Sequence, residues 1–170
     1  HKPDGSIEWQ RLYRGPGRDI GYSVQQTPDR GYIVAAESTS MGPGLGILLI
    51  RLDASGSFVW GGHYTGSFMS DPIHTPDPGV ALDQGEQGEF YVTGNFGGFP
   101  VVLAVAPGGA LIWQNVYADP AGPDGGARYA FTDIKYDETD NTLVVSGTSA
   151  RPEFVDPGMP PVDVRHAFLM

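Results

Sequence analysis

Apolar and polar residues alternate with a period of two in short runs along this chain, and glycine or proline separates one run from the next. In the first run, Ile7 and Trp9 alternate with Glu8 and Gln10. This alternation predicts a strand with one buried face. No window has apolar residues at the i, i+3, i+4 and i+7 spacing of an amphipathic helix. The pattern therefore predicts an all-β fold.

The same pattern predicts strands in three groups of four along the chain. The first group covers residues 6–13, 21–26, 32–36 and 47–52, the second 58–64, 79–83, 89–94 and 101–105, and the third 111–117, 129–136, 142–147 and 167–170. Turn residues such as those of Thr27–Gly31 separate them, with a proline that presets φ and a glycine that accepts positive φ. Each predicted group begins with a strand that contains a tryptophan.

A nine-residue pattern, glycine, then tryptophan four positions on, then tyrosine after four more, occurs three times. Its members are Gly5, Trp9 and Tyr13, then Gly56, Trp60 and Tyr64, then Gly109, Trp113 and Tyr117. A recurrence at this period is typical of repeat proteins. Four antiparallel strands in about 50 residues predict a β-propeller blade, and an ordinary β-sandwich is the alternative. The three repeats, about 1–50, 51–104 and 105–170, form a single predicted domain, 1–170.

Three blades leave two open sheet edges, and open edges favour pairing with another strand. Propellers have four to eight blades. Both ends of the chain fall at the same point of the repeat. We therefore expect a subunit or piece of a larger assembly, whose partner is a second copy or the remaining blades of the same polypeptide.

Composition excludes several classes of protein. The net charge is −10 and no basic patch occurs, which excludes nucleic acid as a partner. Cysteine is absent, so disulfides, thiolate metal sites and cysteine nucleophiles are excluded. No run of 18 apolar residues occurs, so we expect no transmembrane segment.

The segments 52–60, 64–66 and 29–36 resemble the repeats of bacterial secreted and cell-surface β-propeller proteins, although Arg30 and Ala36 depart from that pattern. The resemblance implies a secreted or cell-surface protein with a structural or interaction role. Asp53, Gly56 and Trp60 also resemble the tryptophan-docking repeat of quinoprotein dehydrogenases, but the spacing from Asp53 to Gly56 is one residue short. The second resemblance implies a quinone-dependent enzyme. The enzymatic alternative is therefore a fragment of a quinone- or calcium-dependent propeller enzyme, an oxidoreductase or hydrolase.

The chemistry of individual residues adds little. We expect the repeated tryptophans and tyrosines to fill the core between blades, since large aromatic rings bury much area. Aspartates in three loops are candidate calcium ligands, or else ordinary turn residues. They are Asp71, Asp77, Asp119, Asp124, Asp137 and Asp140.

The segment 150–164 interrupts the third repeat and is the candidate binding loop, because long loops on a rigid scaffold commonly carry binding. Its charged residues are Arg151, Glu153, Asp156 and Asp163. No catalytic constellation and no cofactor other than calcium is predicted. We therefore expect a non-enzymatic extracellular structural or interaction protein, a scaffold or assembly subunit. The alternative is a module that binds a protein or glycan through its loops.

Overall fold

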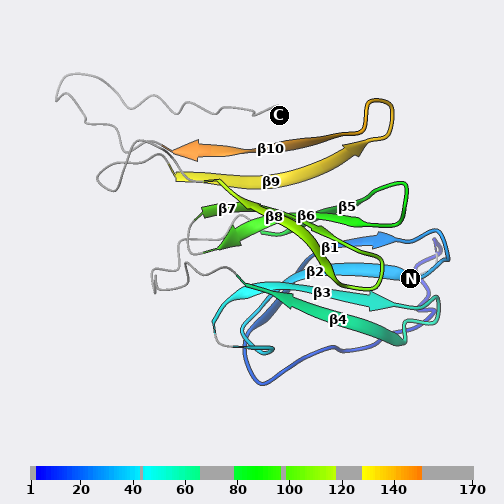
Figure 1. The fold of residues 1–170 in the computed structure, drawn as a ribbon. Helices are drawn as coiled ribbons and strands as arrows, with labels where there is room; N and C mark the ends of the chain where they lie inside the picture. The colour runs from blue at the N-terminus through cyan, green and yellow to red at the C-terminus, as the bar shows by residue number, and fades with distance from the viewer. Residues whose placement is uncertain (1–2, 43, 66–78, 97–98, 118–127, 151–170) are drawn as a thin grey trace, which may run out of the picture.

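The computed structural model describes residues 3–42, 44–65, 79–96, 99–117 and 128–150 (Figure 1). Within these ranges the protein contains ten strands and no helix. Every strand pair is antiparallel. The prediction of an all-β, antiparallel fold is confirmed. The described residues include no helix of the length and apolar character that a membrane crossing needs.

The strands form three sheets. Sheet 1 consists of β1 (Asp19–Gln26), β2 (Tyr32–Ser38), β3 (Gly46–Leu52) and β4 (Phe58–Tyr64), in that order. Sheet 2 consists of β5 (Ala81–Gln84), β6 (Phe90–Phe96), β7 (Phe99–Val105) and β8 (Leu111–Val116), in that order. Sheet 3 consists of β9 (Arg128–Asp137) and β10 (Thr142–Ala150). Among the described strands no sheet closes into a barrel or ring.

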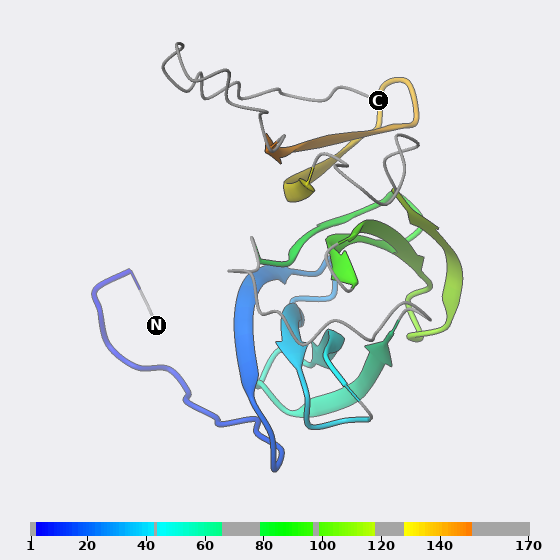
Figure 2. The same cartoon turned by 90° about the vertical axis from the view of Figure 1, so that its left-hand side faces the viewer.

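Sheet 2 lies between the other two, and the three sheets stack face to face (Figures 1 and 2). Side chains alternate between the two faces of a strand. Val92 and Leu103 are fully buried against sheet 1, in a cluster that includes Ile33 and Leu49. Val102 belongs to a second cluster with residues of sheet 3 such as Ile134. The near-continuous apolar run of β7 reflects burial on both faces.

The sheets are offset from the sequence repeats by one strand. β4 and β8, which carry Trp60 and Trp113, end sheets 1 and 2, whereas the sequence analysis placed each tryptophan strand first in its group. The reason is local: a five-residue turn joins β3 to β4, and antiparallel strands joined by tight turns pair with each other. A longer connection separates β4 from β5.

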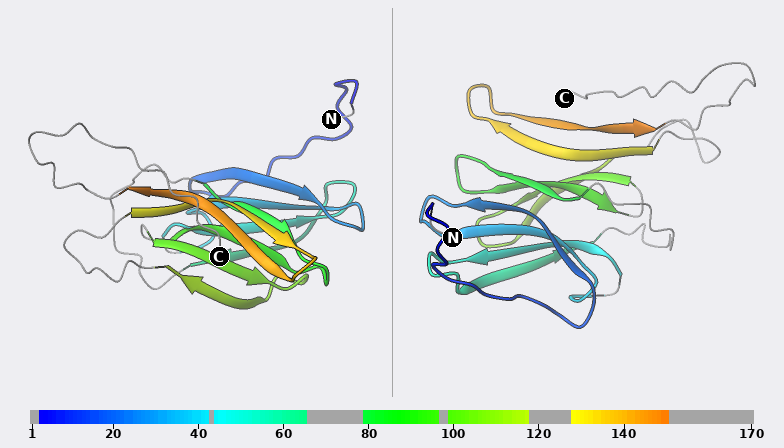
Figure 3. Two further views of the ribbon diagram at one scale, coloured as in Figure 1. Left: turned by 90° about the horizontal axis from the view of Figure 1, so that it is seen from above. Right: turned by 180° about the vertical axis from the view of Figure 1, so that it is seen from behind.

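The prediction of a strand over residues 6–13 is wrong. This segment runs beside sheet 1 without strand structure (Figure 3). A strand requires a hydrogen-bonded neighbour, and no described strand pairs with it. The remaining predicted strands appear within a few residues of their expected bounds, except that the strand predicted over 167–170 lies outside the described residues.

Four hairpin turns share one backbone geometry. In each, the first N–H bonds the fifth carbonyl and the fourth N–H bonds the first carbonyl; the turns are Thr27–Gly31, Asp53–Ser57, Gly85–Glu89 and Ala106–Ala110. The fourth position is left-handed, with φ of 67° at Arg30, 75° at Gly56, 86° at Gly88 and 89° at Gly109. Glycine adopts this conformation freely, whereas an L-residue is strained by about 1–2 kcal/mol. Arg30 is therefore the strained member of the set.

Candidate functional site

A tryptophan and a tyrosine of β4 dock onto the turn between β7 and β8. The Trp60 indole N–H donates to the Pro107 carbonyl oxygen at 2.9 Å, and the Tyr64 hydroxyl donates to the Gly109 carbonyl oxygen at 2.7 Å. An added Cβ at Gly109 would come within 3.0 Å of the Trp60 ring carbon Cε3. Burial of Tyr64 raises the pKa of its phenol to about 12. We call this arrangement the docking contact; it fastens sheet 1 to sheet 2.

The same docking contact recurs one repeat earlier. The Tyr13 hydroxyl donates to the Gly56 carbonyl oxygen, and a Cβ at Gly56 would come within 2.7 Å of the Trp9 ring. Trp9 also lies edge-to-face against Tyr32, with ring centroids 5.6 Å apart. Tyr32 alternates with the buried Ile33, so Trp9 lies on the face of sheet 1 that points away from sheet 2.

The third set of repeat residues is arranged differently. Trp113 lies on the face of β8 toward sheet 3, where its ring packs 6.3 Å from Tyr91 between centroids, and 36% of it is exposed. Tyr117 packs edge-to-face on Phe131, with ring centroids 5.2 Å apart. All three tryptophans therefore occupy junctions between sheets or the outer face of a sheet. The sequence analysis expected all these aromatic residues to fill the core between blades. Tyr64 is a buried member of the core cluster and Trp60 packs against it, whereas Trp113 is exposed at the edge of its sheet.

A buried arginine holds the turn between β1 and β2. Arg51 of β3 is 9% exposed, and its guanidinium donates to both carboxylate oxygens of Asp29, at 2.7 and 2.6 Å. The same group donates to the carbonyl oxygens of Tyr32 and Leu52. Hydrogen bonds from Thr27 and Gly31, together with Arg51, hold the pKa of Asp29 below its usual value. A residue of β3 thereby fixes the turn that joins β1 to β2.

Asp83 of β5 connects all three sheets. Its side chain is 13% exposed. One carboxylate oxygen accepts a hydrogen bond from the Gln25 side chain of sheet 1 at 3.1 Å, and the other accepts one from the Tyr136 backbone N–H of sheet 3 at 2.9 Å. The Lys135 ammonium lies 3.8 Å from the second oxygen. Charge-assisted hydrogen bonds of this kind are stronger than neutral ones.

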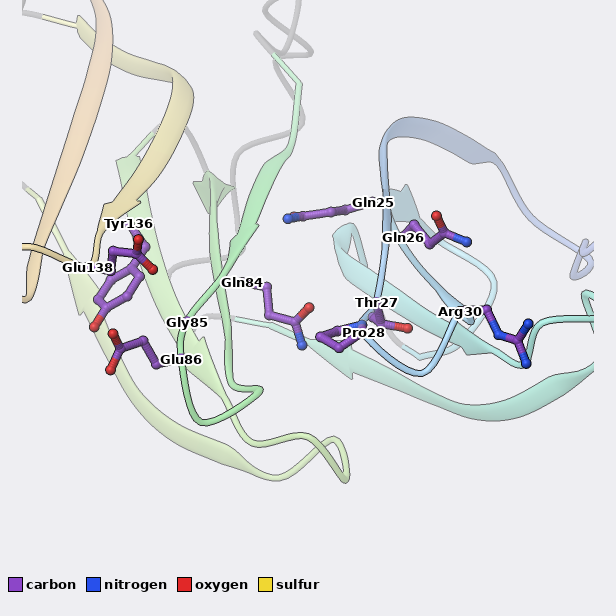
Figure 4. Close-up of a pocket in the computed structure, with 10 residues that line it drawn as sticks. All are labelled: Gln25, Gln26, Thr27, Pro28, Arg30, Gln84, Gly85, Glu86, Tyr136 and Glu138. Atoms are coloured by element: carbon purple, nitrogen blue, oxygen red, sulfur yellow. The ribbon is translucent and has the colours of Figure 1, made fainter. Parts of the chain in front are cut away.

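An open groove of about 540 Å³ lies beside Asp83, where three hairpin turns meet (Figure 4). Its lining is polar and comes from the β1–β2, β5–β6 and β9–β10 turns. The lining residues are Gln25, Gln26, Thr27, Pro28, Arg30, Gln84, Gly85, Glu86, Tyr136 and Glu138. Sheet 1 supplies the only cation among these lining residues, whereas sheets 2 and 3 supply the carboxylates.

Two stacked tyrosines stand at the acidic side of this groove. The rings of Tyr91 and Tyr136 are 5.5 Å apart and 25° from parallel. Burial, and then the hydrogen bond that the Tyr91 hydroxyl donates to Glu89 at 2.9 Å, raise the pKa of Tyr91 to about 12. Burial raises the pKa of Tyr136 first of all, and Glu86 adds to that shift. Both phenols therefore remain neutral hydrogen-bonding groups at physiological pH.

Two of the six calcium candidates, Asp137 and Asp140, lie in the described part of the chain. Asp137 accepts a hydrogen bond from the Thr139 backbone N–H, and Asp140 accepts one from the Thr142 hydroxyl, as ordinary turn residues do. Within the described residues no three histidine, aspartate or glutamate side chains form a metal-binding group. The other calcium candidates, Asp71, Asp77, Asp119 and Asp124, lie outside the described residues, as does the candidate binding loop with Arg151, Glu153, Asp156 and Asp163.

The sequence analysis missed Asp83, Gln25 and Arg51. Arg51 had a signal, because a charged residue in the otherwise apolar run 47–52 demands a buried partner. Asp83 and Gln25 had none, since their contact joins strands that lie 58 residues apart.

Known proteins provide no guide to this arrangement: the chain matches no protein-family model, no curated protein and no solved structure.

Proposed function

We propose that the protein is a non-enzymatic structural and interaction protein of propeller-type repeats, which works outside a bacterial cell as a scaffold or assembly subunit. The docking contact of Trp60 and Tyr64 on the Gly109 turn carries this proposal. It ties one sheet to the next with residues that recur at the repeat period. Each such contact joins one repeat to the next, and a scaffold requires rigid connections of this kind between its repeats.

The stacking of the sheets favours the propeller over the sandwich. β1 contacts β5, and β5 contacts β9, so the first strands of the three sheets lie side by side. Asp83 links these same three strands through its hydrogen bonds. A two-sheet sandwich has no third sheet on its far side, whereas blades of a propeller follow one another around an axis.

The titration behaviour of the described carboxyl groups agrees with a non-enzymatic role. A general acid needs a carboxyl group whose pKa is raised toward neutral pH. The shifted carboxyl groups here, on Asp4, Asp19, Asp29 and Asp53, all have lowered pKa values, and in each case hydrogen bonds to nearby backbone or side-chain groups are the largest cause. Asp29 and Asp53 thereby hold hairpin turns, and Asp19 holds the start of β1.

Hydrogen exchange tests the structural part of the proposal. Tyr64→Phe removes one bond between sheets 1 and 2, and it should speed backbone exchange in both sheets. Faster exchange confined to β4 would show that the docking contact does not couple the sheets. Protease treatment of intact bacteria tests the location: the protein should be cleaved, or be found in the medium, without cell lysis. Protection until lysis would contradict an extracellular role.

The groove in Figure 4 favours a second candidate function, binding of a glycan. Side-chain amides of Gln25, Gln26 and Gln84 and the phenol of Tyr136 line it, and these groups both donate and accept hydrogen bonds, as hydroxyl-rich ligands require. Titration calorimetry with neutral oligosaccharides tests it. Gln84→Ala should weaken binding at least about tenfold if the amide bonds the ligand, whereas Gln114→Ala, on exposed β8, should not.

A further inference from the structure

We propose that β8 is an assembly edge, along which a second copy of this chain adds its own β8 in antiparallel orientation. Sheet 2 of one copy and sheet 2 of the other then form one continuous sheet. The inference rests on the proposed function, because it names the surface and the partner through which an assembly subunit associates.

β8 is the most exposed strand of sheets 1 and 2. It is the last strand of sheet 2, and no described strand pairs with its outer edge. Five of its six residues are exposed, and Leu111, Ile112 and Trp113 are 45%, 56% and 36% exposed. β4, the last strand of sheet 1, is exposed at three of its seven positions. Contiguous exposed apolar side chains of this kind mark interaction sites.

The sequence around β8 lacks charge. No charged residue occurs from Phe90 to Tyr117, although the chain contains 10 lysines and arginines and 20 aspartates and glutamates. Exposed edge strands ordinarily carry lysine, proline or an inward-pointing charge, which prevent pairing with other chains. β8 contains none of these. Its outer edge is therefore not protected in these ways against a further strand.

The lack of charge also favours a second copy as the partner. Two copies each carry a net charge of −10, so they repel one another over most of their surface. Like charges placed opposite each other in a contact oppose association. An uncharged strand is the part of the surface where two copies can meet without that repulsion.

The backbone of Gln114 points its hydrogen-bonding groups toward the open edge. The Tyr117 N–H donates to the Pro100 carbonyl oxygen of β7 at 2.8 Å, and the register between β7 and β8 is regular from Trp113 to Val116. Successive N–H groups of an antiparallel strand alternate in direction. Gln114 and Val116 therefore direct their N–H and C=O groups away from β7.

A twofold axis at Gln114 uses these groups. Residues directly opposite each other in an antiparallel pair lie on the same face, and a twofold contact places one residue opposite itself at the axis. The backbones of the two Gln114 residues then exchange a pair of hydrogen bonds. Val116 lies opposite Ile112, and Trp113 lies opposite Asn115. These pairs join apolar or neutral side chains, so the strand is complementary to itself.

Light scattering against concentration tests the inference. One added strand pair buries less area than a standard interface of about 800 Å² per partner, so the dimer should be weak and concentration-dependent. The mass should rise from 18.1 kDa toward twice that value as the concentration approaches about 1 mM. A mass that stays at 18.1 kDa over this whole range would overturn the inference.

Two charge variants test the position of the axis. Gln114→Lys places two like charges opposite each other and should weaken association at least about tenfold, and Gln114→Glu should do the same. An equimolar mixture of the two variants should associate again, because each lysine then faces a glutamate. A mixture that remains monomeric would contradict the twofold contact at Gln114.

Val59→Lys is the matched control for these variants. Val59 lies on β4, the last strand of sheet 1, and is 54% exposed. The substitution adds the same charge to an exposed position and should leave the association unchanged. Equal weakening by Val59→Lys and Gln114→Lys would show that β8 pairs with β4 or that net charge alone controls association, and either result would overturn the inference.

Backbone hydrogen exchange of the wild-type chain provides a test that requires no variant. Exchange at Gln114 and Val116 should slow as the concentration rises, because their N–H groups become bonded in the dimer. The Asn115 N–H points toward β7, so its exchange should not depend on concentration. Equal slowing at Gln114 and Asn115 would argue against pairing at this edge.

The failure of this inference can be distinguished from failure of the proposed function. A chain that stays monomeric leaves the proposed function standing if Tyr64→Phe still speeds exchange in both sheets. A chain that dimerises through β8 while its sheets exchange independently would contradict the proposed function instead.

Discussion

The hydroxyl of Tyr64 donates a hydrogen bond to the carbonyl oxygen of Gly109, 2.7 Å away and 45 residues further along the chain. Tyr13 and Gly56 form the equivalent bond at a separation of 43 residues. Both tyrosines belong to the repeated pattern, and both acceptors are the glycine of the following copy. The repeated glycine, tryptophan and tyrosine thus form a contact between neighbouring copies of the repeat. They do more than define one strand.

Removing the Tyr64 hydroxyl should destabilise the protein. Tyr64 is 8% exposed, so Tyr64→Phe leaves the Gly109 carbonyl without its partner in a buried setting, at a cost of about 1–3 kcal/mol. Tyr13→Phe is the control, because Tyr13 is only partly buried, and it should cost less than half as much. Urea unfolding measures both. Equal losses would show that burial does not set the strength of this bond.

The space at Gly109 should tolerate no methyl group. Gly109→Ala places an L-residue at φ 89° and a Cβ within 3.0 Å of the Trp60 ring, so we expect a loss of about 2 kcal/mol or more and a changed Trp60 fluorescence. Gly108→Ala should cost less than about 0.5 kcal/mol, because nothing lies within 4 Å of its Cβ. Similar losses at both positions would contradict the role of the close approach.

Arg30→Gly should stabilise the protein. Arg30 occupies the left-handed position of its turn with φ 67°, a strain of about 1–2 kcal/mol that glycine relieves, against an entropic cost of about 0.5–1 kcal/mol. We expect a net gain of about 0.5–1 kcal/mol in the free energy of unfolding. Arg30→Ala removes the same charge but keeps the strained φ, so any gain from that variant would point to charge rather than strain.

Asp83→Ala should weaken all three sheets together. Gln25 and the Tyr136 backbone both lose a carboxylate acceptor, at a combined cost of about 2–4 kcal/mol. Asp133→Ala is the control, since the Asp133 side chain accepts a hydrogen bond from its neighbour Ile134. Calorimetry should show a lower midpoint for the first variant with unfolding still in one transition, and a nearly unchanged midpoint for the second.

Stability should fall in acid. The pKa values of Asp4, Asp19, Asp29 and Asp53 are lowered from 3.8 in the folded protein. A group with a depressed folded pKa contributes stability above its unfolded pKa and loses it as the pH falls through the folded value. The free energy of unfolding should therefore decline as the pH drops below 3.8. The double variant Asp29→Asn, Asp53→Asn should show a shallower decline, measured by urea unfolding at several pH values.

The sequence predicted the strands far better than their grouping. Alternation and turn residues mark a strand such as β2 locally, because side chains point to opposite faces and turns have few allowed conformations. Whether the Trp60 strand ends one sheet or begins the next depends on which connection is tight, and the tryptophan pattern does not contain that information. The repeat pattern alone therefore could not predict the one-strand offset between the repeats and the sheets.

In the candidate site, too, the sequence identified individual residues but not the contacts between them. The pattern identified Trp60, Tyr64 and Gly109 as repeat residues, and it missed that the first two contact the third. No pattern in the neighbouring sequence identifies Asp83, since its hydrogen-bond partners Gln25 and Tyr136 lie on strands far away in sequence. Contacts of this kind follow from the stacking of sheets, which the periodicity of single strands does not determine.

The one-strand offset also bears on how such a chain can lengthen during evolution. A duplication that follows the sequence repeat, cut near residue 51, passes through sheet 1 and not between sheets 1 and 2. Each added repeat therefore supplies its tryptophan strand to the sheet that the preceding repeat began, as β4 does for sheet 1 and β8 for sheet 2. Sheets 1 and 2 each draw their strands from two neighbouring repeats, so a new copy is held to the preceding one by strand pairing as well as by the peptide chain.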